Sequence, residues 1–484
     1  MRAPGDILLV ACYELGHQPL SLASPLSTLR QAGFSPSAID TSVQSLDDAT
    51  VRAARLIGIS VPMHTALRLG VQVAERAHNA HPEAFIVFYG LYASLNADYL
   101  LRGHADAVIG GEYEQALLAL AEALDAGAGA DSLAIDGVRT SRVDAAPVLQ
   151  RLPFSVPARD SLPPLRQYAH LVRGDEVVSA GYVEATRGCL HTCLHCPITP
   201  VYGGRFFVIP RAVVLEDIRA QVAAGARHIT FGDPDFLNGP GHALAITRAL
   251  HQEFPDVTFD ATIKVEHILE RREVIAELGQ LGCAFIVSAV ESLSPNVLRH
   301  LAKGHTRADV VEALRILDQA GIPMRPTFVA FTPWTTADDY LETVDFVREH
   351  GLIEHIDPVQ YSIRLLVPPG SALLNAPDTA DWLGPLDEQG FSYRWEHSDP
   401  RMDALQREVA ALVERYAAEQ RPTTETFAAI HALAERRLGR HDAASVGITG
   451  GLSASAAIHE QLLRLASGTA KQRPIPHLTE AWFC

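Results

Sequence analysis

The sequence predicts an α/β protein with two sheets in series, and three observations support this. Apolar strand-like runs alternate with helical segments over the first 150 residues, a tight cysteine cluster follows a strand near residue 185, and a strand–loop–helix pattern then continues to about residue 370. Such alternation is typical of parallel sheets covered by helices. We expect a doubly wound sheet over 1–150, a connector over 151–180, a partial TIM-type barrel of six βα units over 181–370, and a helical region over 371–484.

The first sheet is predicted from short apolar runs that read as buried parallel strands. Ligands of doubly wound sheets bind at the carboxyl ends of the strands, which directs attention to the residues that follow each run. The expected strands are Ile7–Ala11, Ser37–Asp40, Leu56–Val61, Ala84–Gly90 and Ala107–Gly111, and the expected helices are Ser24–Ala32, Ala66–Asn79 and Tyr113–Ala126.

The barrel and the C-terminal region follow from the same patterns. Four prolines in the connector break regular structure before the barrel begins. The active site of a TIM-type barrel lies at the carboxyl ends of its strands. The expected barrel strands are Tyr182–Ala185, His228–Asp235, Phe259–Thr262, Phe285–Ser292, Met324–Val329 and Val359–Leu366, and the expected C-terminal helices are Met402–Gln420, Glu425–Leu438 and Ala454–Ala466.

Three of the six cysteines lie in one loop, where Cys189, Cys193 and Cys196 have the spacing C-x3-C-x2-C. Thiolates are soft ligands that suit zinc and iron–sulfur clusters. A structural zinc site and an ordinary 4Fe-4S cluster each take four protein ligands, so three cysteines leave one iron of a cubane open to a substrate. The alternative is a zinc knuckle in which His191 or His195 is the fourth ligand.

This stretch resembles the radical S-adenosylmethionine (radical SAM) superfamily, whose signature is CxxxCxxC on the loop after the first strand of a partial barrel. The resemblance implies that the open iron chelates the amino and carboxylate groups of S-adenosylmethionine. One electron from the cluster, supplied by a donor such as flavodoxin or ferredoxin, would then break a carbon–sulfur bond and release a carbon radical. His195 departs from the family's usual Phe, Tyr or Trp before the third cysteine, although imidazole is also a flat ring.

By the same resemblance, polar residues at the ends of the barrel strands would contact S-adenosylmethionine. Gly232 and Asp233 partly match the family's Gly-Gly-Glu segment, and Asp233 would accept a hydrogen bond from the methionine amino group. Ser288 and Glu291 stand where the family has ribose contacts, and a carboxylate suits vicinal hydroxyls because it accepts two strong hydrogen bonds. The alternative for Glu291 is a cap on the following helix.

The order of elements over residues 5–125 resembles the cobalamin-binding domain found upstream of many radical SAM enzymes. The matching segments are Gly58-Ile59-Ser60, Gly90-Leu91-Tyr92-Ala93-Ser94 and Gly111-Glu112-Tyr113-Glu114. The resemblance implies that the cofactor contacts are Ser60, Gly90, Ser94, Gly111 and Glu112.

Two departures in this domain leave the binding of cobalamin open. The family's Asp-x-His-x-x-Gly segment, whose histidine ligates cobalt, is absent after the first strand, and His17 stands in that loop in a different pattern. Tyr89, Tyr92 and Tyr113 replace small or polar residues in loops that would admit a corrin. The alternative is a domain that keeps the fold and no longer binds cobalamin.

Charge and composition exclude several classes of partner. The formal charge of −17 disfavours nucleic acid and anionic membranes, so a small-molecule substrate is expected. The first residues lack the apolar run of a signal peptide, and no stretch approaches 18 uncharged apolar residues. With three clustered cysteines, this composition predicts a protein of the reducing cytoplasm.

The C-terminal residues suggest a second chemistry. Cys484 follows Trp482-Phe483, and this tail resembles a small radical SAM group whose chains end in Cys-Cys-Ala-Glu-Pro or Cys-selenocysteine-Ala-Glu-Pro. Relatives of that group include the enzyme that transfers a 3-amino-3-carboxypropyl group to arsenite in arsinothricin biosynthesis, which would make Cys484 a reactive thiol for a soft acceptor. A frayed terminus with a chance cysteine is the alternative.

Taken together, these patterns predict reductive cleavage of S-adenosylmethionine followed by transfer of an alkyl group to a small molecule. The first version is methyl transfer with a 4Fe-4S cluster, S-adenosylmethionine and, if the N-terminal resemblance extends to function, cobalamin. The second is 3-amino-3-carboxypropyl transfer to arsenic. A hypothesis of another class is a non-catalytic metal-binding or redox module. The sequence does not identify the substrate.

Overall fold

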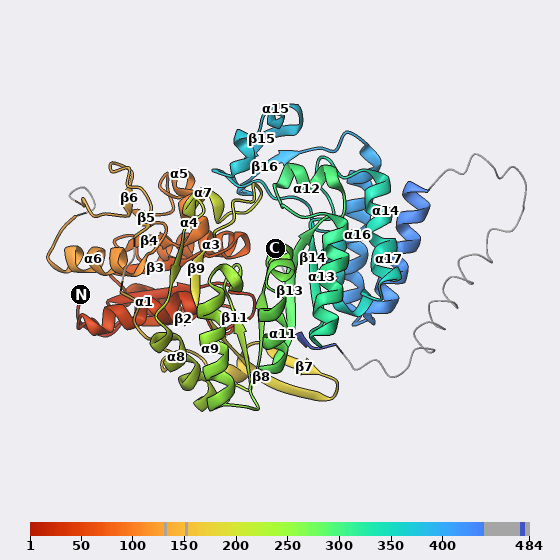
Figure 1. Cartoon of the computed structure of the whole chain (residues 1–484). Helices are drawn as coiled ribbons and strands as arrows, with labels where there is room; N and C mark the ends of the chain where they lie inside the picture. Colours follow the sequence, from red (N-terminus) through yellow and green to blue (C-terminus); the bar gives the residue numbers. More distant parts are fainter. Residues whose placement is uncertain (130–132, 151–152, 440–474, 480–484) are drawn as a thin grey trace, which may run out of the picture.

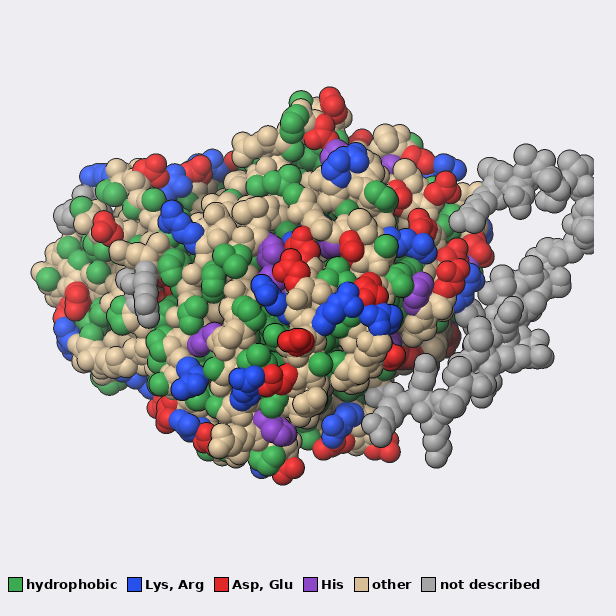
Figure 2. Space-filling model, in the orientation of Figure 1, with side chains coloured by type: hydrophobic (Ala, Val, Ile, Leu, Met, Phe, Trp, Pro, Cys, Tyr) green, Lys and Arg blue, Asp and Glu red, His purple; other side chains and the backbone are tan. Residues whose placement is uncertain are grey.

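The structure is a computed structural model that describes residues 1–129, 133–150, 153–439 and 475–479. The N-terminal sheet and the barrel-like sheet lie side by side, and helices α16 and α17 pack against the far side of the barrel (Figure 1). The predicted fold class is confirmed. Acidic and basic side chains are interspersed over the face seen in Figure 2.

The N-terminal sheet has the order β2-β1-β3-β4-β5-β6, in which β6 alone is antiparallel to its neighbour. Successive residues of β1 pack on opposite faces, because side chains alternate along a strand. Leu9 lies in the core beneath α1 and α6, whereas Leu8 and Val10 lie in the core beneath α3. The elements are β1 (Ile7–Ala11), α1 (Leu20–Gln31), β2 (Ser37–Asp40), α2 (Asp48–Ala53), β3 (Leu56–Ser60), α3 (His64–Ala80), β4 (Phe85–Tyr89), α4 (Leu91–Leu95), α5 (Ala97–Leu100), β5 (Ala107–Ile109), α6 (Glu114–Asp125) and β6 (Val138–Thr140).

Helix α1 begins at Leu20, four residues before the predicted start, and contains Pro25. Proline has no backbone N–H, so it cannot bond the carbonyl one turn earlier, which is that of Ser21. The hydroxyl of Tyr89, at the end of β4, donates to this carbonyl at 3.0 Å. The buried tyrosine thus satisfies the acceptor that the proline leaves open and ties α1 to the sheet.

The second sheet has the order β14-β13-β12-β11-β8-β7-β17. Strands β8, β11, β12, β13 and β14 are parallel, and β7 and β17 extend one edge in antiparallel fashion. The elements are β7 (His170–Arg173), β8 (Glu176–Val183), β9 (Thr186–Gly188), α7 (Thr199–Tyr202), β10 (Phe206–Val208), α8 (Arg211–Ala223), β11 (His228–Phe231), α9 (Pro240–Glu253), β12 (Thr258–Thr262), α10 (Val265–Glu270), α11 (Arg272–Gln280), β13 (Cys283–Glu291), α12 (Pro295–Leu301), α13 (Arg307–Gln319), β14 (Met324–Phe328), α14 (Ala337–Glu349) and β17 (His477–Leu478).

The predicted sixth barrel strand, Val359–Leu366, is wrong in its first half. Residues Pro358–Tyr361 form a 3-10 helix, because Pro358 starts the turn and the carboxylate of Asp357 accepts a hydrogen bond from the N–H of Val359. Only a single bridge, between Phe331 and Arg364, continues the sheet at this position. The segment 151–180, predicted as a connector, contains β7 and the start of β8, so the barrel sheet begins within it.

The C-terminal helices pack on the barrel through residues at helical spacing, which include Leu405 and Val409 on α16 and Phe427 and Ile430 on α17. The predicted helix 454–466 lies outside the described residues, as does Cys484. None of the helices within the described ranges is long and apolar enough to cross a membrane. The elements are α15 (Thr379–Trp382), β15 (Leu383–Asp387), β16 (Ser392–Trp395), α16 (Pro400–Ala418) and α17 (Thr423–Leu438).

Candidate active site at the junction of the two sheets

The three clustered cysteines lie on the loop that joins β9 to α7, at the carboxyl end of β8. Cys189 and Cys193 are buried, Cys196 is half-buried, and all three are free thiols. Burial raises the pKa of the Cys196 thiol to about 12, and the thiols of Cys193 and Cys189 act in the same direction. Thiols held this way lose their protons when a metal binds, so the loop fits the three-cysteine side of a 4Fe-4S cluster.

The two histidines of the cysteine loop are the candidates for the fourth ligand of a zinc knuckle, and each contacts a carboxylate. His191 Nε2 lies 3.3 Å from Asp235 Oδ2, and His195 Nε2 lies 3.2 Å from Glu291 Oε1. Both imidazoles therefore contact carboxylates from neighbouring strand ends. This arrangement favours the open three-cysteine cluster over the zinc alternative.

Asp233 holds the entry to the cysteine loop. Its carboxylate accepts hydrogen bonds from the backbone N–H of Ala185 at 2.9 Å and from the hydroxyl of Thr186 at 2.5 Å. Burial raises the pKa of Asp233 to about 7, although these two donors oppose the rise. The observed contacts give Asp233 a positioning role, and its predicted contact with the methionine amino group stays a prediction.

Position 232 requires glycine because the side chain of Tyr182 passes directly over its Cα. A Cβ at this position would overlap the hydroxyl of Tyr182, which crosses over the end of β11. The sequence motif had suggested a cofactor contact through the Gly232 backbone, and that contact also stays a prediction.

Glu291 ends β13 at a bulge, with the unusual φ of +65°. Its carboxylate lies 3.2 Å from His195 Nε2 and 3.6 Å from Lys303 Nζ. Burial alone would raise the pKa of Glu291, but Lys303 and His195 together lower it to about 2. The helix-cap alternative is wrong, because Ser294 is the residue that precedes α12 and Glu291 points to the cysteine loop instead. Left-handed backbone in a non-glycine residue is costly and clusters at functional sites.

Ser288 lies on β13, three residues before Glu291, and is fully buried. Its hydroxyl makes no hydrogen bond to the described residues. A buried hydroxyl without a partner is uncommon and is compatible with a ligand contact, which stays a prediction.

A buried ion cluster joins the N-terminal domain to the cysteine loop, and no motif in the sequence indicated it. Arg187, two residues before Cys189, donates to Glu114 at 2.6 Å and to Glu184 at 2.8 Å, and lies 3.3 Å from Glu112. The hydroxyl of Tyr202 donates to Glu112 at 3.0 Å. Burial raises the pKa of Glu112 to about 6, while Arg187 opposes the rise. Glu112, predicted as a cofactor contact, thus holds the cysteine loop from the neighbouring sheet.

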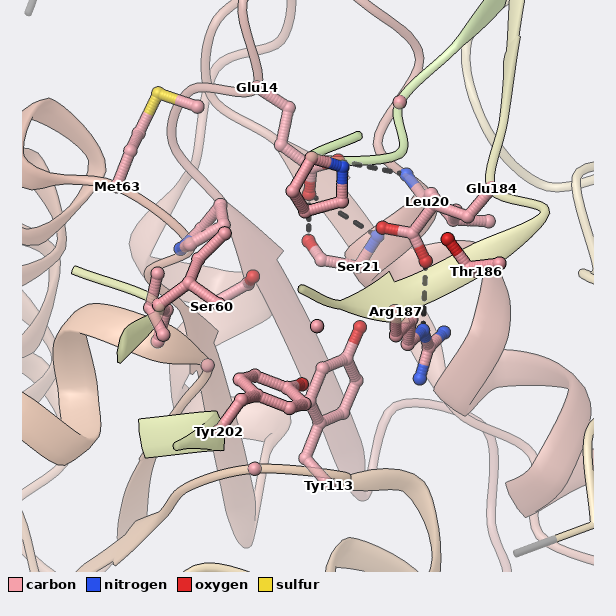
Figure 3. Close-up of a pocket in the computed structure, with 18 of the residues that line it drawn as sticks. Glu14, Leu20, Ser21, Ser60, Met63, Tyr113, Glu184, Thr186, Arg187 and Tyr202 are labelled. Atoms are coloured by element: carbon pink, nitrogen blue, oxygen red, sulfur yellow. Dashed lines mark hydrogen bonds and ion pairs between the residues drawn. The ribbon is translucent and has the colours of Figure 1, made fainter. Parts of the chain in front are cut away.

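The interdomain cavity, about 180 Å³ in volume, opens between the strand ends of the N-terminal sheet and strand β9 (Figure 3). Three of the predicted cobalamin contacts line it, namely Ser60, Gly90 and Gly111. Ser94 stands behind this wall, where its hydroxyl packs against Gly110.

Two features of the interdomain cavity fit a corrin-type cofactor. The hydroxyl of Ser60 is buried and makes no hydrogen bond to the described residues, so it is available to a ligand. Gly90 and Gly111 line the wall with φ of +106° and +70°, a left-handed backbone that favours glycine. None of the described lining residues is a histidine, and the loop after β1 offers Glu14 instead. The residues therefore fit a cofactor that receives no imidazole from the protein.

Glu14 is fixed by the start of α1. Its carboxylate accepts hydrogen bonds from the N–H of Leu20 at 3.0 Å and from the N–H and hydroxyl of Ser21 (Figure 3). Burial raises the pKa of Glu14 to about 7, although the Ser21 hydroxyl opposes the rise. Glu14 can therefore gain or lose a proton near neutral pH at the wall of the interdomain cavity.

His17 faces a different space. It stacks on Tyr182 with ring centroids 4.8 Å apart and lines the barrel cavity, a hollow of about 420 Å³. Asp260, Thr262 and His477 also line the barrel cavity. The two cavities share part of their walls, which consists of Leu15, Tyr182, Gly232 and Pro234. His17 is therefore not placed as a cobalt ligand for the interdomain cavity.

The comparisons with known proteins agree with this geometry. Residues 183–347 match the radical SAM superfamily model, and residues 7–121 match the B12 binding domain model. The chain carries a radical SAM domain behind a B12-binding domain. The first match covers the cysteine loop and strands β11 to β14 of the radical SAM domain, and the second covers β1 to β5 of the B12-binding domain. The predicted resemblance is confirmed at this level, whereas membership of the group with the Cys-Cys-Ala-Glu-Pro tail is not.

Several curated relatives are methylases by name. An uncharacterized methyltransferase of Pyrococcus horikoshii is 24% identical over 65% of this chain and 67% of its own length. The hopanoid C-3 methylase of Methylococcus capsulatus is 25% identical over 66% of this chain and 62% of its own length. A putative methylthiotransferase of Methanocaldococcus jannaschii is matched over 43% of its length, so the chain spans between two fifths and two thirds of these relatives.

Two solved structures share the fold. The cobalamin-dependent S-adenosylmethionine radical enzyme OxsB, with aqua-cobalamin and S-adenosylmethionine bound, superposes with a TM-score of 0.70 at 15% identity, over 97% of this chain and 76% of that one. The radical S-adenosylmethionine methyltransferase TsrM from Kitasatospora setae, with cobalamin and a [4Fe-4S] cluster bound, gives a TM-score of 0.59 at 18% identity, over 72% of this chain and 73% of that one. At these identities the likeness concerns the fold.

Proposed function

We propose that this protein is a cobalamin-dependent radical SAM methyltransferase that acts on a small molecule. The observation that carries the proposal is the interdomain cavity, because strand ends of the B12-binding domain and the start of the cysteine loop form its opposite walls. The methylase names of the relatives support the same class of reaction. A 4Fe-4S cluster would supply an electron to S-adenosylmethionine, and cobalamin would supply a cobalt that accepts and passes on a methyl group.

The chain's own residues would have three tasks in this reaction. Cys189, Cys193 and Cys196 would hold the cluster and leave one iron for S-adenosylmethionine. Glu291, ionised and fixed by Lys303, would bind hydroxyl groups of that cosubstrate.

The third task, to present cobalamin, would fall to the wall of the interdomain cavity. Ser60 would donate its free hydroxyl there, and Gly90 and Gly111 would leave room for the ring.

The test uses the co-product of S-adenosylmethionine and needs no knowledge of the acceptor. Loss of the methyl group leaves S-adenosylhomocysteine, loss of the 3-amino-3-carboxypropyl group leaves 5′-methylthioadenosine, and reductive cleavage to the adenosyl radical leaves 5′-deoxyadenosine and methionine. Anaerobically reconstituted protein with cobalamin and reductant is expected to release S-adenosylhomocysteine. If 5′-methylthioadenosine is the main co-product, methyl transfer is wrong and 3-amino-3-carboxypropyl transfer becomes the better proposal.

Cobalt content provides an independent check. The Ser60→Leu variant fills the cavity wall and is expected to lose bound cobalamin while its iron content stays unchanged. The matched control is Ser45→Leu at an exposed position outside the cavity. Equal cobalt in the wild type and in Ser60→Leu, or none in either, would contradict the proposed cofactor.

The 3-amino-3-carboxypropyl alternative rests on Cys484, which lies outside the described residues. The electron donor, predicted as flavodoxin or ferredoxin, also remains a proposal. Neither choice changes the assignment of the cysteine loop.

A further inference from the structure

Beside the cysteine loop, three side chains from different strand ends converge on one point. They are His191 on the loop, Asp235 after β11, and His267 on α10. Their ligand atoms, His191 Nε2, Asp235 Oδ2 and His267 Nδ1, all lie within 4.8 Å of one another. None of these residues takes part in the function proposed above.

The distances among these atoms suit coordination. Asp235 Oδ2 lies 3.3 Å from His191 Nε2 and 2.8 Å from His267 Nδ1. Ligands about 2.0–2.1 Å from a zinc-type ion stand ~2.9 Å apart at a right angle and ~3.4 Å apart at the tetrahedral angle. Both observed distances fall in or next to this range.

The angles favour coordination over direct hydrogen bonding. All three atoms are buried, and none makes a geometrically acceptable hydrogen bond to the described residues. Asp235 Oδ2 lies within ion-pair distance of both imidazoles, so the three atoms face one another in an arrangement that a shared ion would satisfy better than poorly aligned hydrogen bonds. A metal ion between them would accept all three lone pairs.

The surroundings orient the proposed ligands. The other oxygen of Asp235 accepts the N–H of Leu237 at 3.1 Å, which fixes the carboxylate plane. His191 Nδ1 lies 3.6 Å from Glu266 Oε2, beyond hydrogen-bond distance, so this carboxylate is a nearby outer charge beside the imidazole. Lys264 pairs with Glu266 at 2.5 Å and lies 3.2 Å from the same ring nitrogen.

The charge and access of the cluster also suit a divalent cation. With neutral imidazoles, Asp235, Glu266 and Lys264 leave one net negative charge. Asp235 is deeply buried, with its side chain 2% exposed, whereas the His191 side chain is 22% exposed although its Nε2 atom is buried. Two imidazoles and one carboxylate with an open position are a ligand set used for Fe²⁺ and for catalytic Zn²⁺.

We propose that His191, Asp235 and His267 form a mononuclear site for a divalent first-row transition metal, Zn²⁺ or Fe²⁺, next to the cysteine loop. The ion would tie the cysteine loop to the ends of β11 and β12. The proposal concerns these three side chains and does not depend on methyl transfer. The competing arrangement is a metal-free chain in which Lys264 donates to His191 and His191 donates to Asp235.

The test separates this site from the cysteines. In the triple variant Cys189→Ala, Cys193→Ala, Cys196→Ala the thiolate ligands are gone, so Co²⁺ added without oxygen can bind only elsewhere. We expect one Co²⁺ per chain with visible d–d absorption, no sulfur-to-cobalt charge-transfer band, and displacement by Zn²⁺. Adding His267→Gln should weaken Co²⁺ binding by about 100-fold or more. Loss of an outer-shell partner of a metal ligand already weakens metal binding by about 10–100-fold, and His267 would be a ligand itself. Adding His251→Gln, on α9 and outside the cluster, should leave binding unchanged.

A second measurement keeps the proposal testable if the triple variant does not fold. Protein with intact cysteines, reconstituted with iron and then exposed to Zn²⁺, should hold one zinc per chain in addition to the iron of the cluster. Asp235→Asn should lose this zinc and keep the cluster absorbance. The proposed metal site is wrong if the folded triple variant does not bind Co²⁺, or if Asp235→Asn keeps its zinc. The metal-free arrangement is then the correct one. Since neither readout uses cobalamin or turnover, failure here is distinguishable from failure of the proposed function.

Discussion

Arg187 Nη1 lies 2.6 Å from Glu114 Oε1, and this pair crosses from the radical SAM domain to the B12-binding domain. Both side chains are more than nine-tenths buried. Because Arg187 is two residues from Cys189, the position of the cysteine loop depends on carboxylates of the other domain.

Replacing Arg187 with Met is expected to destabilise the protein strongly, because the buried Glu112 and Glu114 and the half-buried Glu184 would be left without their cation. Breaking a buried ion pair in this way costs about 3–5 kcal/mol. Thermal unfolding should show the loss. Arg76→Met, which removes an exposed pair with Asp48, is the control and should cost no more than about 1 kcal/mol. Similar melting temperatures for both variants would show that the interdomain cluster does not stabilise the structure.

The three cysteines are expected to bind one 4Fe-4S cluster. Anaerobic reconstitution should give about four irons per chain, which is the cubane count, and the triple Cys→Ala variant should bind almost none. Iron and sulfide analysis with visible absorption measures this. Stoichiometric zinc at the cysteines with no iron would restore the zinc-knuckle interpretation.

Glu291→Gln is expected to weaken binding of S-adenosylmethionine without loss of the cluster. Removing a charged hydrogen-bond partner costs about 1.5–3 kcal/mol, a tenfold effect or more. Equilibrium binding to the reconstituted protein tests this, with Glu349→Gln at the exposed end of α14 as the control. An unchanged affinity in Glu291→Gln would limit this residue to holding His195 and Lys303.

The raised pKa of Glu14 predicts a pH dependence of stability. The folded state holds the proton up to about pH 7, whereas an unfolded glutamate loses it near 4.5. The folded protein thus binds more protons between these values, so this contribution to stability is fully present below about pH 4.5 and is lost as the pH rises through 7. Asp233 acts in the same direction. Melting temperatures across this range should fall less in Glu14→Gln than in the wild type, and parallel curves would exclude a role for Glu14.

The tail prediction can now be tied to a described anchor. Strand β17 pairs with β7, and its residues His477 and Leu478 line the barrel cavity. Cys484 is the fifth residue after Thr479, and five extended residues span at most about 18 Å. If Cys484 is the reactive thiol, deletion of 481–484 should leave cleavage of S-adenosylmethionine intact and abolish product formation. If the truncated enzyme forms product at the full rate, Cys484 is not the reactive thiol.

The sequence predicted the sheets well because their strands are short apolar runs. Ile7–Ala11 and Ser37–Asp40 match to the residue. The cysteine loop was recognisable because its three cysteines lie within eight consecutive residues at a spacing typical of a cluster site. The strand prediction for Val359–Leu366 failed for a local reason. Asp357 and Pro358 start a 3-10 helix there, although the segment is as apolar as a buried strand.

The contacts between distant segments could not be predicted. Arg187 looks like any charged residue, and two of its partners, Glu112 and Glu114, lie more than 70 positions earlier. His267 gave no signal, because its neighbours in sequence, Glu266 and Ile268, say nothing of Asp235. Only the meeting of separate strand ends reveals these groups.

The ring of Tyr182 lies in the wall shared by the interdomain and barrel cavities, against Gly232. It therefore acts as a partition between two compartments, one beside the B12-binding domain and one inside the barrel. A molecule bound in the barrel cannot reach a group in the interdomain cavity along this path unless the tyrosine side chain moves. Leu15, Gly232 and Pro234 complete this wall, so a smaller side chain in place of Tyr182 would thin the partition and enlarge the space that an acceptor could share between the two compartments.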